Sequence, residues 1–234
     1  MEEKMNPIVI KTGPLRVNTV IVPLSGCDAF VVDPAACAFS KDENVIISRL
    51  EKEGLNPVAI VLTHGHFDHV SGLPAMNKKY PGIPILIHKG DSGFVGPNSA
   101  ETHDEHLYRM GFDEFLPSVT NLPPATSFLV DGKSLLDCME GSASKLPEET
   151  KNALADWKII HTPGHTEGGV CLLNRKEKIL VSGDTLFYHS WGRTDLPGGN
   201  ERELQKSLSA ILYEIENDVR IFPGHDKCGF TKED

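Results

Sequence analysis

The sequence predicts an α/β fold in which two β-sheets pack face to face and helices cover their outer faces. Short runs rich in β-branched residues alternate with amphipathic helical segments in both halves of the chain, and runs of this composition are typical of strands. In both halves, His and Asp residues follow directly after strand-like runs. Because sheets and amphipathic helices must bury their apolar faces, this pattern indicates a sheet-on-sheet core with outer helices and one shared rim.

The first half begins with an antiparallel meander. Between residues 8 and 33, the runs PIVI, RVNTVIVPL and DAFVVDP are separated by turn residues. The segment KDENVIISRLEKEG then predicts a helix, since Ile46 and Leu50 have helical spacing and Gly54 provides a stop. The apolar run VAIVLTH follows as a further strand, and the first histidines stand at its C-terminal end.

The second half repeats this order of elements without a sequence repeat of fixed period. WKIIHTPGH predicts a strand that ends in a loop, and GGVCLLN and KILVSGD predict a hairpin that turns at residues 174–177. NERELQKSLSAILYEIE has the spacing of an amphipathic helix, and a final short strand, DVRIF, ends in PGH. Both halves therefore place metal-binding types of side chain at strand ends.

A polar region rich in Pro and Gly, residues 89–156, separates the two halves. It contains HDEHLYRMGFDEF, which is predicted to be helical, and LPEETKNALADW, whose Pro147 and Glu148 suit a helix N-terminus. Since no low-complexity linker marks a boundary, we expect residues 1–234 to form a single domain with an elaborated middle insert. Loops of this size near a rim often shape substrate access.

The composition disfavours several classes of partner. The chain has a formal net charge of −10, whereas nucleic acids and anionic membranes attract clustered Lys and Arg. We therefore expect a small-molecule substrate and neither nucleic acid nor membrane as a partner. The acidic start MEEKMNPIVI does not suit a signal peptide, and the dispersed, odd number of cysteines predicts free thiols. Both observations favour a cytoplasmic location, and the oligomeric state stays open.

Side chains with metal-binding chemistry are concentrated in four short motifs, HGHFDH, TPGH, SGDTLF and FPGH. Zinc and neighbouring first-row metals bind imidazole and carboxylate groups, and a catalytic site keeps one position open for water. Seven such side chains are too many for one tetrahedral ion, but they suit two ions that share a bridging carboxylate. The candidate ligands are His64, His66, Asp68, His69, His165, Asp184 and His225.

These motifs resemble those of the metallo-β-lactamase fold superfamily, in the order typical of the family and over nearly the whole chain. The resemblance implies a four-layer αββα sandwich, with two mixed β-sheets packed face to face and helices outside. It also implies a ligand set for each of two metal ions. The first set would be His64, His66 and His165, and the second Asp68, His69 and His225, with Asp184 bridging the ions.

The resemblance further implies two divalent metal ions, with zinc as the first choice and iron or manganese as alternatives. A metal lowers the pKa of bound water to about 7, so a bridging hydroxide can attack a carbonyl carbon without a protein nucleophile. Asp68 would orient this hydroxide and is the candidate catalytic residue. No Ser-His-Asp or Cys-His arrangement is evident that would offer another route.

Within the superfamily, FYHSWGRTDLPGG after GDTLF resembles the glyoxalase II-like branch, which includes the hydroxyacylglutathione hydrolases and the persulfide dioxygenases. No motif position is Cys, unlike in many two-metal zinc β-lactamases, and His66 stands where flavodiiron proteins carry Glu. The implied function is a binuclear metal-dependent hydrolase that cleaves a thioester or related acyl ester. Full-length glyoxalase II enzymes carry a further C-terminal helical region, so we expect glutathione recognition by that route to be missing.

Other functions remain open at this point. A mononuclear iron persulfide dioxygenase would use only His64, His165 and Asp184. A phosphodiesterase or nuclease of the superfamily is disfavoured by the acidic balance and the lack of a basic arm. A non-catalytic metal-binding protein is disfavoured because every ligand position is intact.

Several residues near the motifs have structural interpretations. Asp68 taken alone is typical of a helix cap, and Asp184 taken alone is typical of a turn. Their positions among the histidine motifs favour metal binding instead. Asp33 in VVDP is interpreted as structural or as a support of the metal site. His88 is predicted to cap a strand or support the site, and other histidines match no ligand position: His103, His106, His161 and His189.

The Gly-rich loop after SGDTLF carries a charged pair. Arg193 and Asp195 are predicted to form a buried or half-buried ion pair that shapes this loop. We expect Tyr188 and Ser190 to lie closer to the substrate. Elsewhere, Cys171 and Cys228 are predicted to be packed thiols rather than nucleophiles, because neither has a general base in the sequence pattern.

Overall fold

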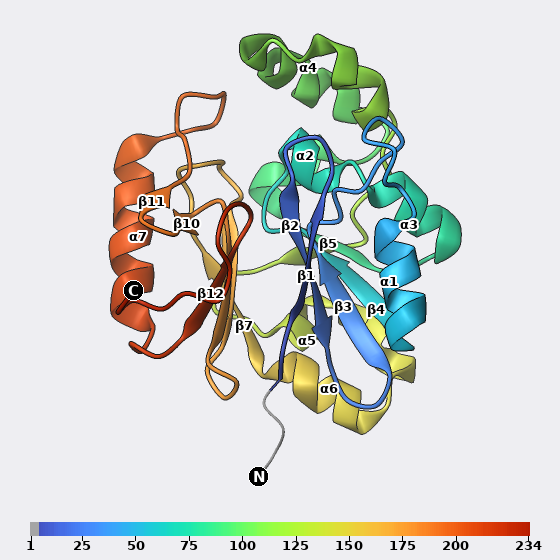
Figure 1. The fold of residues 1–234 in the computed structure, drawn as a ribbon, viewed down its shortest axis with the longest axis vertical. Helices are drawn as coiled ribbons and strands as arrows, with labels where there is room; N and C mark the ends of the chain where they lie inside the picture. Colours follow the sequence, from blue (N-terminus) through green and yellow to red (C-terminus); the bar gives the residue numbers. More distant parts are fainter. Residues whose placement is uncertain (1–4) are drawn as a thin grey trace.

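The computed structural model describes residues 5–234 and has the predicted α/β architecture of two mixed sheets between outer helices (Figure 1). Residues 1–4, where the acidic start MEEK was noted, lie outside the described residues. In the figure, α7 flanks one sheet, and α1 and α3 flank the other. The four-layer αββα sandwich is therefore confirmed, while the extent of the domain over residues 1–234 stays a prediction.

The first sheet has six strands in the order of the sequence. The predicted meander is confirmed, because the first three strands pair antiparallel, and the next three add to the sheet in parallel. The strands are β1 (Ile8–Thr12), β2 (Val17–Pro23), β3 (Asp28–Val32), β4 (Asn56–Val61), β5 (Ile85–His88) and β6 (Ser127–Leu129). The connection from β3 to β4 is α1 (Val45–Glu53), which ends at Gly54 in a left-handed conformation with φ of 67°.

The second sheet has the strand order β12, β9, β8, β7. β7 (Trp157–His161), β8 (Val170–Asn174) and β9 (Ile179–Gly183) pair antiparallel, which confirms the predicted hairpin, and β12 (Arg220–Pro223) pairs parallel with β9. The predicted amphipathic helix is α7 (Glu201–Glu214). It begins after Asn200, whose side-chain oxygen accepts a hydrogen bond from the backbone N–H of Glu203.

Three apolar clusters separate the four layers. The middle cluster joins the two sheets and contains Phe30 and Trp157, whose rings meet edge to face at 5.2 Å between centroids. An outer cluster packs α1 and α3 (Leu73–Lys79) on the first sheet through Leu50 and its neighbours, and another packs α7 on the second sheet through Ile211. The central strands β2, β3, β4, β8 and β9 are thus buried on both faces, which explains their nearly continuous apolar sequences.

The middle region folds into short helices around one strand. The predicted helical segments are confirmed as α4 (Ser99–Met110) with η2 (Asp113–Val119), and as α6 (Glu148–Ala155) directly after Pro147. No sequence pattern predicted β6, which places part of this region inside the first sheet. The remaining helices are η1 (Lys89–Phe94), α5 (Leu135–Cys138) and η3 (Glu140–Lys145).

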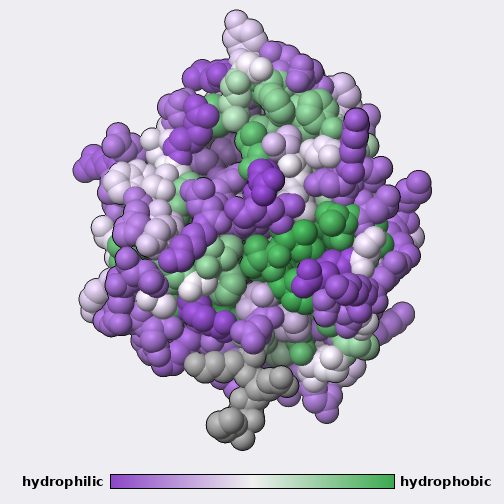
Figure 2. All heavy atoms as spheres, in the orientation of Figure 1, coloured by the Kyte–Doolittle hydropathy of each residue, from purple (hydrophilic) through white to green (hydrophobic). Residues whose placement is uncertain are grey.

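The surface in the view of Figure 2 is largely hydrophilic, in keeping with the acidic composition. Hydrophobic residues come to the surface in the middle of this face, over β1 and its neighbours. Among the helices of residues 5–234, none combines the length and the apolar character that crossing a bilayer requires.

Candidate metal centre

The predicted ligands stand at four strand ends. β4 leads into HGHFDH, whose last residues belong to the short helix α2 (Phe67–Val70), while β7, β9 and β12 lead into His165, Asp184 and His225. β7, β9 and β12 run in one direction, because β12 is parallel to β9 and both β7 and β9 are antiparallel to β8. Their carboxyl ends therefore meet at one edge of the second sheet, where the structure brings all seven side chains together.

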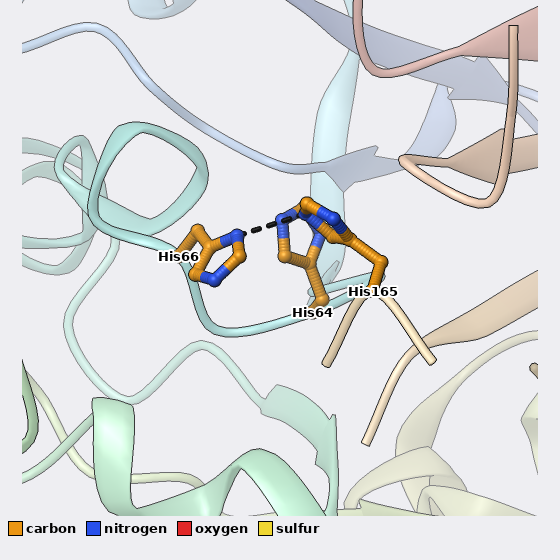
Figure 3. Close-up of side chains that lie close together, drawn as sticks. All are labelled: His64, His66 and His165. Atoms are coloured by element: carbon orange, nitrogen blue, oxygen red, sulfur yellow. Dashed lines mark hydrogen bonds between the residues drawn. The ribbon is translucent and has the colours of Figure 1, made fainter. Parts of the chain in front are cut away.

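Three histidines form the first group. His64, His66 and His165 are buried, and each offers one nitrogen within 4.8 Å of the nitrogens of the other two. Figure 3 shows the three imidazoles close together, with Nδ1 of His66 lying 2.9 Å from Nε2 of His165. Three neutral imidazoles at these distances can bind one divalent ion.

Asp68, His69 and His225 form the second group, again with ligand atoms within 4.8 Å of one another. Oδ2 of Asp68 lies 3.3 Å from Nε2 of His225 and 3.7 Å from Nε2 of His69. Asp184 faces both groups, since its Oδ1 lies 3.4 Å from Nε2 of His69 and its Oδ2 lies 3.5 Å from Nε2 of His165. This position suits a carboxylate shared by two ions.

The donor atoms of these groups fit metal ions. Among the buried side-chain atoms of residues 5–234 that lack a hydrogen-bond partner are Nε2 of His64 and Oδ1 of Asp184. Burying a polar atom without a partner costs free energy, and coordination of a cation removes that cost. The His and Asp clusters are thus consistent with a binuclear metal site, and imidazole and carboxylate ligands suit zinc, iron and manganese alike.

Burial and neighbouring charges set the protonation of the groups. Burial, reinforced by the other histidines, holds the pKa of His64 and of His66 well below the usual value, so both imidazoles are neutral. Burial alone would lower the pKa of His69, but the carboxylates of Asp184, Asp68 and Asp33 raise it to about 10. The carboxylates that raise this pKa would equally attract a metal cation, which binds His69 only after the imidazole loses its proton.

Asp33 supports the second group from behind, as the sequence interpretation expected. Its carboxylate accepts hydrogen bonds from the backbone N–H of Thr63 at 2.7 Å, from the Thr63 hydroxyl at 2.6 Å, and from Nδ1 of His69 at 2.9 Å. The bond to Nδ1 leaves Nε2 of His69 free to face Asp68 and Asp184. Carboxylate partners of this kind fix the tautomer and the orientation of a metal-binding histidine.

Asp91 is a buried residue near the centre that the sequence reasoning missed. Its carboxylate accepts hydrogen bonds from the backbone N–H groups of Gly65 and Gly168 and from the hydroxyl of Thr166. The only signal available was its position, three residues after β5 ends at His88. A lone Asp at a strand end is more typical of a turn.

The remaining histidines lie around the centre in other roles. His88 ends β5, accepts a hydrogen bond from the N–H of Gly90, and stacks on His161 with ring centroids 4.1 Å apart. His106 was not expected near the ligands, but its ring centroid lies 5.4 Å from that of His66. Its two nitrogens lie at hydrogen-bond distance from the carbonyls of Thr102 and Pro197.

Gly224 stands directly before His225 and packs against the ligands. A Cβ at this position would lie 2.1 Å from Oδ1 of Asp184 and 2.7 Å from Cε1 of His69. These distances are shorter than any van der Waals contact, and neither neighbour can move without leaving its ligand position. The PG pair of the FPGH motif therefore requires glycine for close approach.

Replacing Gly224 with alanine is expected to weaken metal binding about 10- to 100-fold, because displaced ligands no longer share one geometry. Gly141→Ala is the matched control, since a Cβ at Gly141 meets no atom within 4 Å. Metal affinity measured by competition with a chromophoric chelator checks this. Equal affinities in the Gly224→Ala and wild-type proteins would contradict the role given to this glycine.

A cavity of about 410 Å³ opens onto both groups, a size suited to a small-molecule substrate. Phe187, Ser190 and Trp191 of the β10 (Leu186–Phe187) and β11 (Ser190–Trp191) hairpin line it. Tyr188 lines a neighbouring cavity, which Ser190 also borders, and the Tyr188 ring lies under Nζ of Lys227 at 4.2 Å. The expected proximity of Tyr188 and Ser190 to the substrate stays a prediction. Other apolar residues in the wall are Leu15, Phe67, Met110 and Leu196.

The Arg193–Asp195 pair is present but exposed. The guanidinium donates two hydrogen bonds of 2.7 Å to the carboxylate, yet the side chains are 46% and 66% exposed, so the prediction of a buried or half-buried pair was wrong. The backbone of this loop contacts the first ligand group, because the carbonyl of Arg193 accepts a 2.7 Å hydrogen bond from Nδ1 of His165. The loop thus orients a candidate ligand through its main chain.

Cys171 and Cys228 are unsuited to act as nucleophiles. Cys171 is buried, Cys228 is partly buried, and burial raises the pKa of each thiol to about 11. A thiol with such a pKa is protonated at neutral pH and is a poor nucleophile. Both were expected to be packed thiols, and the structure agrees.

Comparison with known proteins connects this geometry to a family. The model of the metallo-beta-lactamase superfamily matches residues 12–137 and 146–225. An uncharacterized protein of Aquifex aeolicus is 31% identical over 218 residues, covering 93% of this chain and 88% of the relative. The hydroxyacylglutathione hydrolase GloC of Haemophilus influenzae is 28% identical over 221 residues, covering 94% of this chain and 91% of GloC.

Solved structures show the same relationship. BLEG-1, described as a B3 metallo-beta-lactamase, aligns with a TM-score of 0.75 and 27% identity over 95% of this chain and 92% of BLEG-1. TTHA1623 in a di-iron-bound form aligns with a TM-score of 0.70 and 26% identity, over 97% of this chain and 94% of TTHA1623. The chain therefore belongs to the metallo-beta-lactamase superfamily.

Proposed function

We propose that this protein is a binuclear metal-dependent hydrolase that cleaves thioesters or related acyl esters, in the manner of the hydroxyacylglutathione hydrolases. One observation carries the proposal: each of two ligand groups places a histidine nitrogen within 3.5 Å of a single carboxylate, Asp184, beside an open cavity. Membership of the superfamily supports metal-dependent hydrolysis. The similarity to GloC supports a thioester as the substrate.

The proposed ligands divide between the ions as the two groups do. His64, His66 and His165 would hold one ion and Asp68, His69 and His225 the other, with Asp184 shared. Zinc is the proposed metal, because imidazole and carboxylate ligands suit it. Iron and manganese accept the same ligands, and the similarity to the di-iron form of TTHA1623 keeps iron as an alternative.

The side chains around the cavity have distinct tasks in this reaction. Bound divalent ions would supply a hydroxide nucleophile at neutral pH and polarise the carbonyl of the substrate. Although burial alone would raise the pKa of Asp68, the nearby His69 and His225 lower it, so this carboxylate is ionised. An ionised Asp68 can accept a hydrogen bond from the attacking water and orient it, while Phe187 and Trp191 wall the cavity that receives the substrate.

Hydrolysis of thioesters of glutathione, coenzyme A and a small thiol, all with one acyl group, tests the proposal when metal content is measured alongside. We expect two ions per chain and release of free thiol by the wild-type protein. His66→Ala is expected to lower turnover, while His161→Ala, a histidine outside both groups, keeps it. A protein with only trace metal, or full turnover by His66→Ala, would overturn the proposal.

A mononuclear iron persulfide dioxygenase is the competing function. It would use only His64, His165 and Asp184, and would leave Asp68, His69 and His225 without a metal. Because these three also present ligand atoms within 4.8 Å of one another, a second complete set of ligand types favours the binuclear hydrolase. Oxygen consumption with a persulfide, together with one iron per chain, would instead support the dioxygenase.

A further inference from the structure

One carboxylate joins the two loops that carry the first ligand group. Asp91 is 1% exposed and lies in η1, directly after β5. Its Oδ2 accepts hydrogen bonds from the backbone N–H of Gly65 at 2.8 Å and from the Thr166 hydroxyl at 2.7 Å, and its Oδ1 accepts one from the N–H of Gly168 at 2.6 Å. Gly65 stands between His64 and His66, and Thr166 directly follows His165.

Glycines let η1 reach both loops at these distances. A Cβ at Gly168 would lie 2.5 Å from the backbone nitrogen of Asp91, and a Cβ at Gly65 would lie 2.3 Å from the ring of Phe94. A Cβ at Gly90 would lie 3.0 Å from Cα of Gly168. Side chains at these three positions would push η1 away, so the close approach depends on local sequence in all three segments.

The three hydrogen bonds are what keeps this carboxylate in place. Burial raises the pKa of Asp91, although the hydrogen bonds from Thr166, Gly65 and Gly168 act in the opposite direction and lower it. No Lys or Arg in residues 5–234 forms an ion pair with it. Because these donors alone hold the buried carboxylate, its position and the positions of the two loops that carry the donors depend on one another.

Two carboxylates support the ligand groups in different ways. Asp33 reaches both groups, because it bonds Nδ1 of His69 and also accepts a hydrogen bond from the Thr63 hydroxyl, which lies 3.1 Å from Nδ1 of His64. Asp91 bonds no ligand side chain and no residue of the second group, but fixes the backbone on either side of the first group. Of the two carboxylates, Asp91 alone has all its hydrogen bonds beside the first group.

We infer that Asp91 is a positioning residue that sets the spacing of His64 and His66 against His165, and thereby the affinity of the first group for its ion. The inference rests on the proposed binuclear centre. Partners that orient metal ligands typically contribute 10- to 100-fold in metal affinity. Loss of the Asp91 hydrogen bonds should therefore lower the affinity of the first group for its ion by about this factor and leave the affinity of the second group unchanged.

Single-group backgrounds separate the two ions in the test. A His225→Ala protein keeps only the first group complete, and a His66→Ala protein keeps only the second. Asp91→Asn is added to each, and zinc affinity is measured by competition with a chromophoric chelator. Asparagine keeps the size of Asp91 but turns an amide donor toward N–H or O–H donors, so at least one of the three bonds is lost.

A milder pair of variants covers the case in which Asp91→Asn does not fold. Thr166→Val removes the hydroxyl that donates to Asp91 at 2.7 Å, and Thr166→Ser restores it. Asp42→Asn is the matched control, because Asp42 also bridges two backbone N–H groups, those of Gly13 and Cys37, away from the ligand loops. Urea unfolding of the metal-free variants measures any effect on the fold itself.

We expect a 10- to 100-fold loss of zinc affinity from Asp91→Asn in the His225→Ala background and less than a twofold change in the His66→Ala background. Thr166→Val should show a smaller loss that Thr166→Ser restores. Equal losses in both backgrounds, or none in either, would overturn the inference while the wild-type centre still binds two ions. A wild-type protein that binds fewer than two ions would instead contradict the proposed function, and the inference with it.

Discussion

Asp184→Asn is expected to lower kcat/KM for a thioester by about 10³-fold, the upper range for removing one preorganised electrostatic group. The two oxygens of Asp184 face both ligand groups, at 3.4 Å from Nε2 of His69 and 3.5 Å from Nε2 of His165. An amide keeps the shape but replaces one oxygen with a donor and removes the negative charge. Steady-state kinetics with free-thiol detection measures the loss, which corresponds to roughly 4 kcal/mol of transition-state stabilisation.

The control for this variant is Asp156→Asn, an exposed carboxylate at the end of α6 that lies 3.8 Å from Lys176. We expect it to keep wild-type kinetics and metal content. Metal content should fall below two ions per chain in Asp184→Asn, because the shared ligand is impaired for both. If Asp184→Asn kept two ions and turned over within tenfold of wild type, a bridging role for this carboxylate would be wrong.

Removal of bound metal with a chelator is expected to lower Tm by roughly 8 to 16 °C. A ligand present at about 1,000 times its Kd stabilises the native state by about 4 kcal/mol, and each kcal/mol shifts Tm by roughly 2 to 4 °C in a domain of this size. The metal-free centre also leaves buried atoms such as Nε2 of His64 without partners. Thermal unfolding followed by circular dichroism, with and without chelator, measures the shift.

Two comparisons make this result specific to the centre. Returning zinc after the chelator has been removed should restore Tm. Asp184→Asn, which already binds less metal, should show a smaller response to the chelator than the wild-type protein. A wild-type Tm that does not respond to chelation would mean that bound metal contributes nothing to stability.

Much of the fold could be predicted because the signals were local. The meander of β1 to β3 and the hairpin of β8 and β9 follow from alternating apolar runs and turn residues. The amphipathic spacing of α7 gave the helix that covers the second sheet. The positions of the histidines after strand-like runs also predicted that the candidate ligands share one rim of the sheets. The structure places them there because the carboxyl ends of parallel strands lie together.

The features that were missed depend on contacts between distant segments. β6 has three residues, too few for a periodic pattern, and its place beside β5 is fixed only by the sheet. Asp91 is a lone carboxylate whose partners Gly65 and Gly168 lie far from it in the sequence. The spacing of Arg193 and Asp195 gave their pairing correctly, but spacing holds no information on which side of a loop faces solvent.

Each ligand group combines residues from the first half of the chain with a residue from the second half, so the order of synthesis determines when each group can bind metal. His64 and His66 leave the ribosome early, but their group needs His165, and the group of Asp68 and His69 needs His225. Domains fold as the chain emerges from its N-terminal end, so a fragment that ends before His165 completes neither group. A chain that has reached Asp184 holds the first group and the shared carboxylate, and the second group is complete only after β12 has joined β9 and brought His225 to the centre.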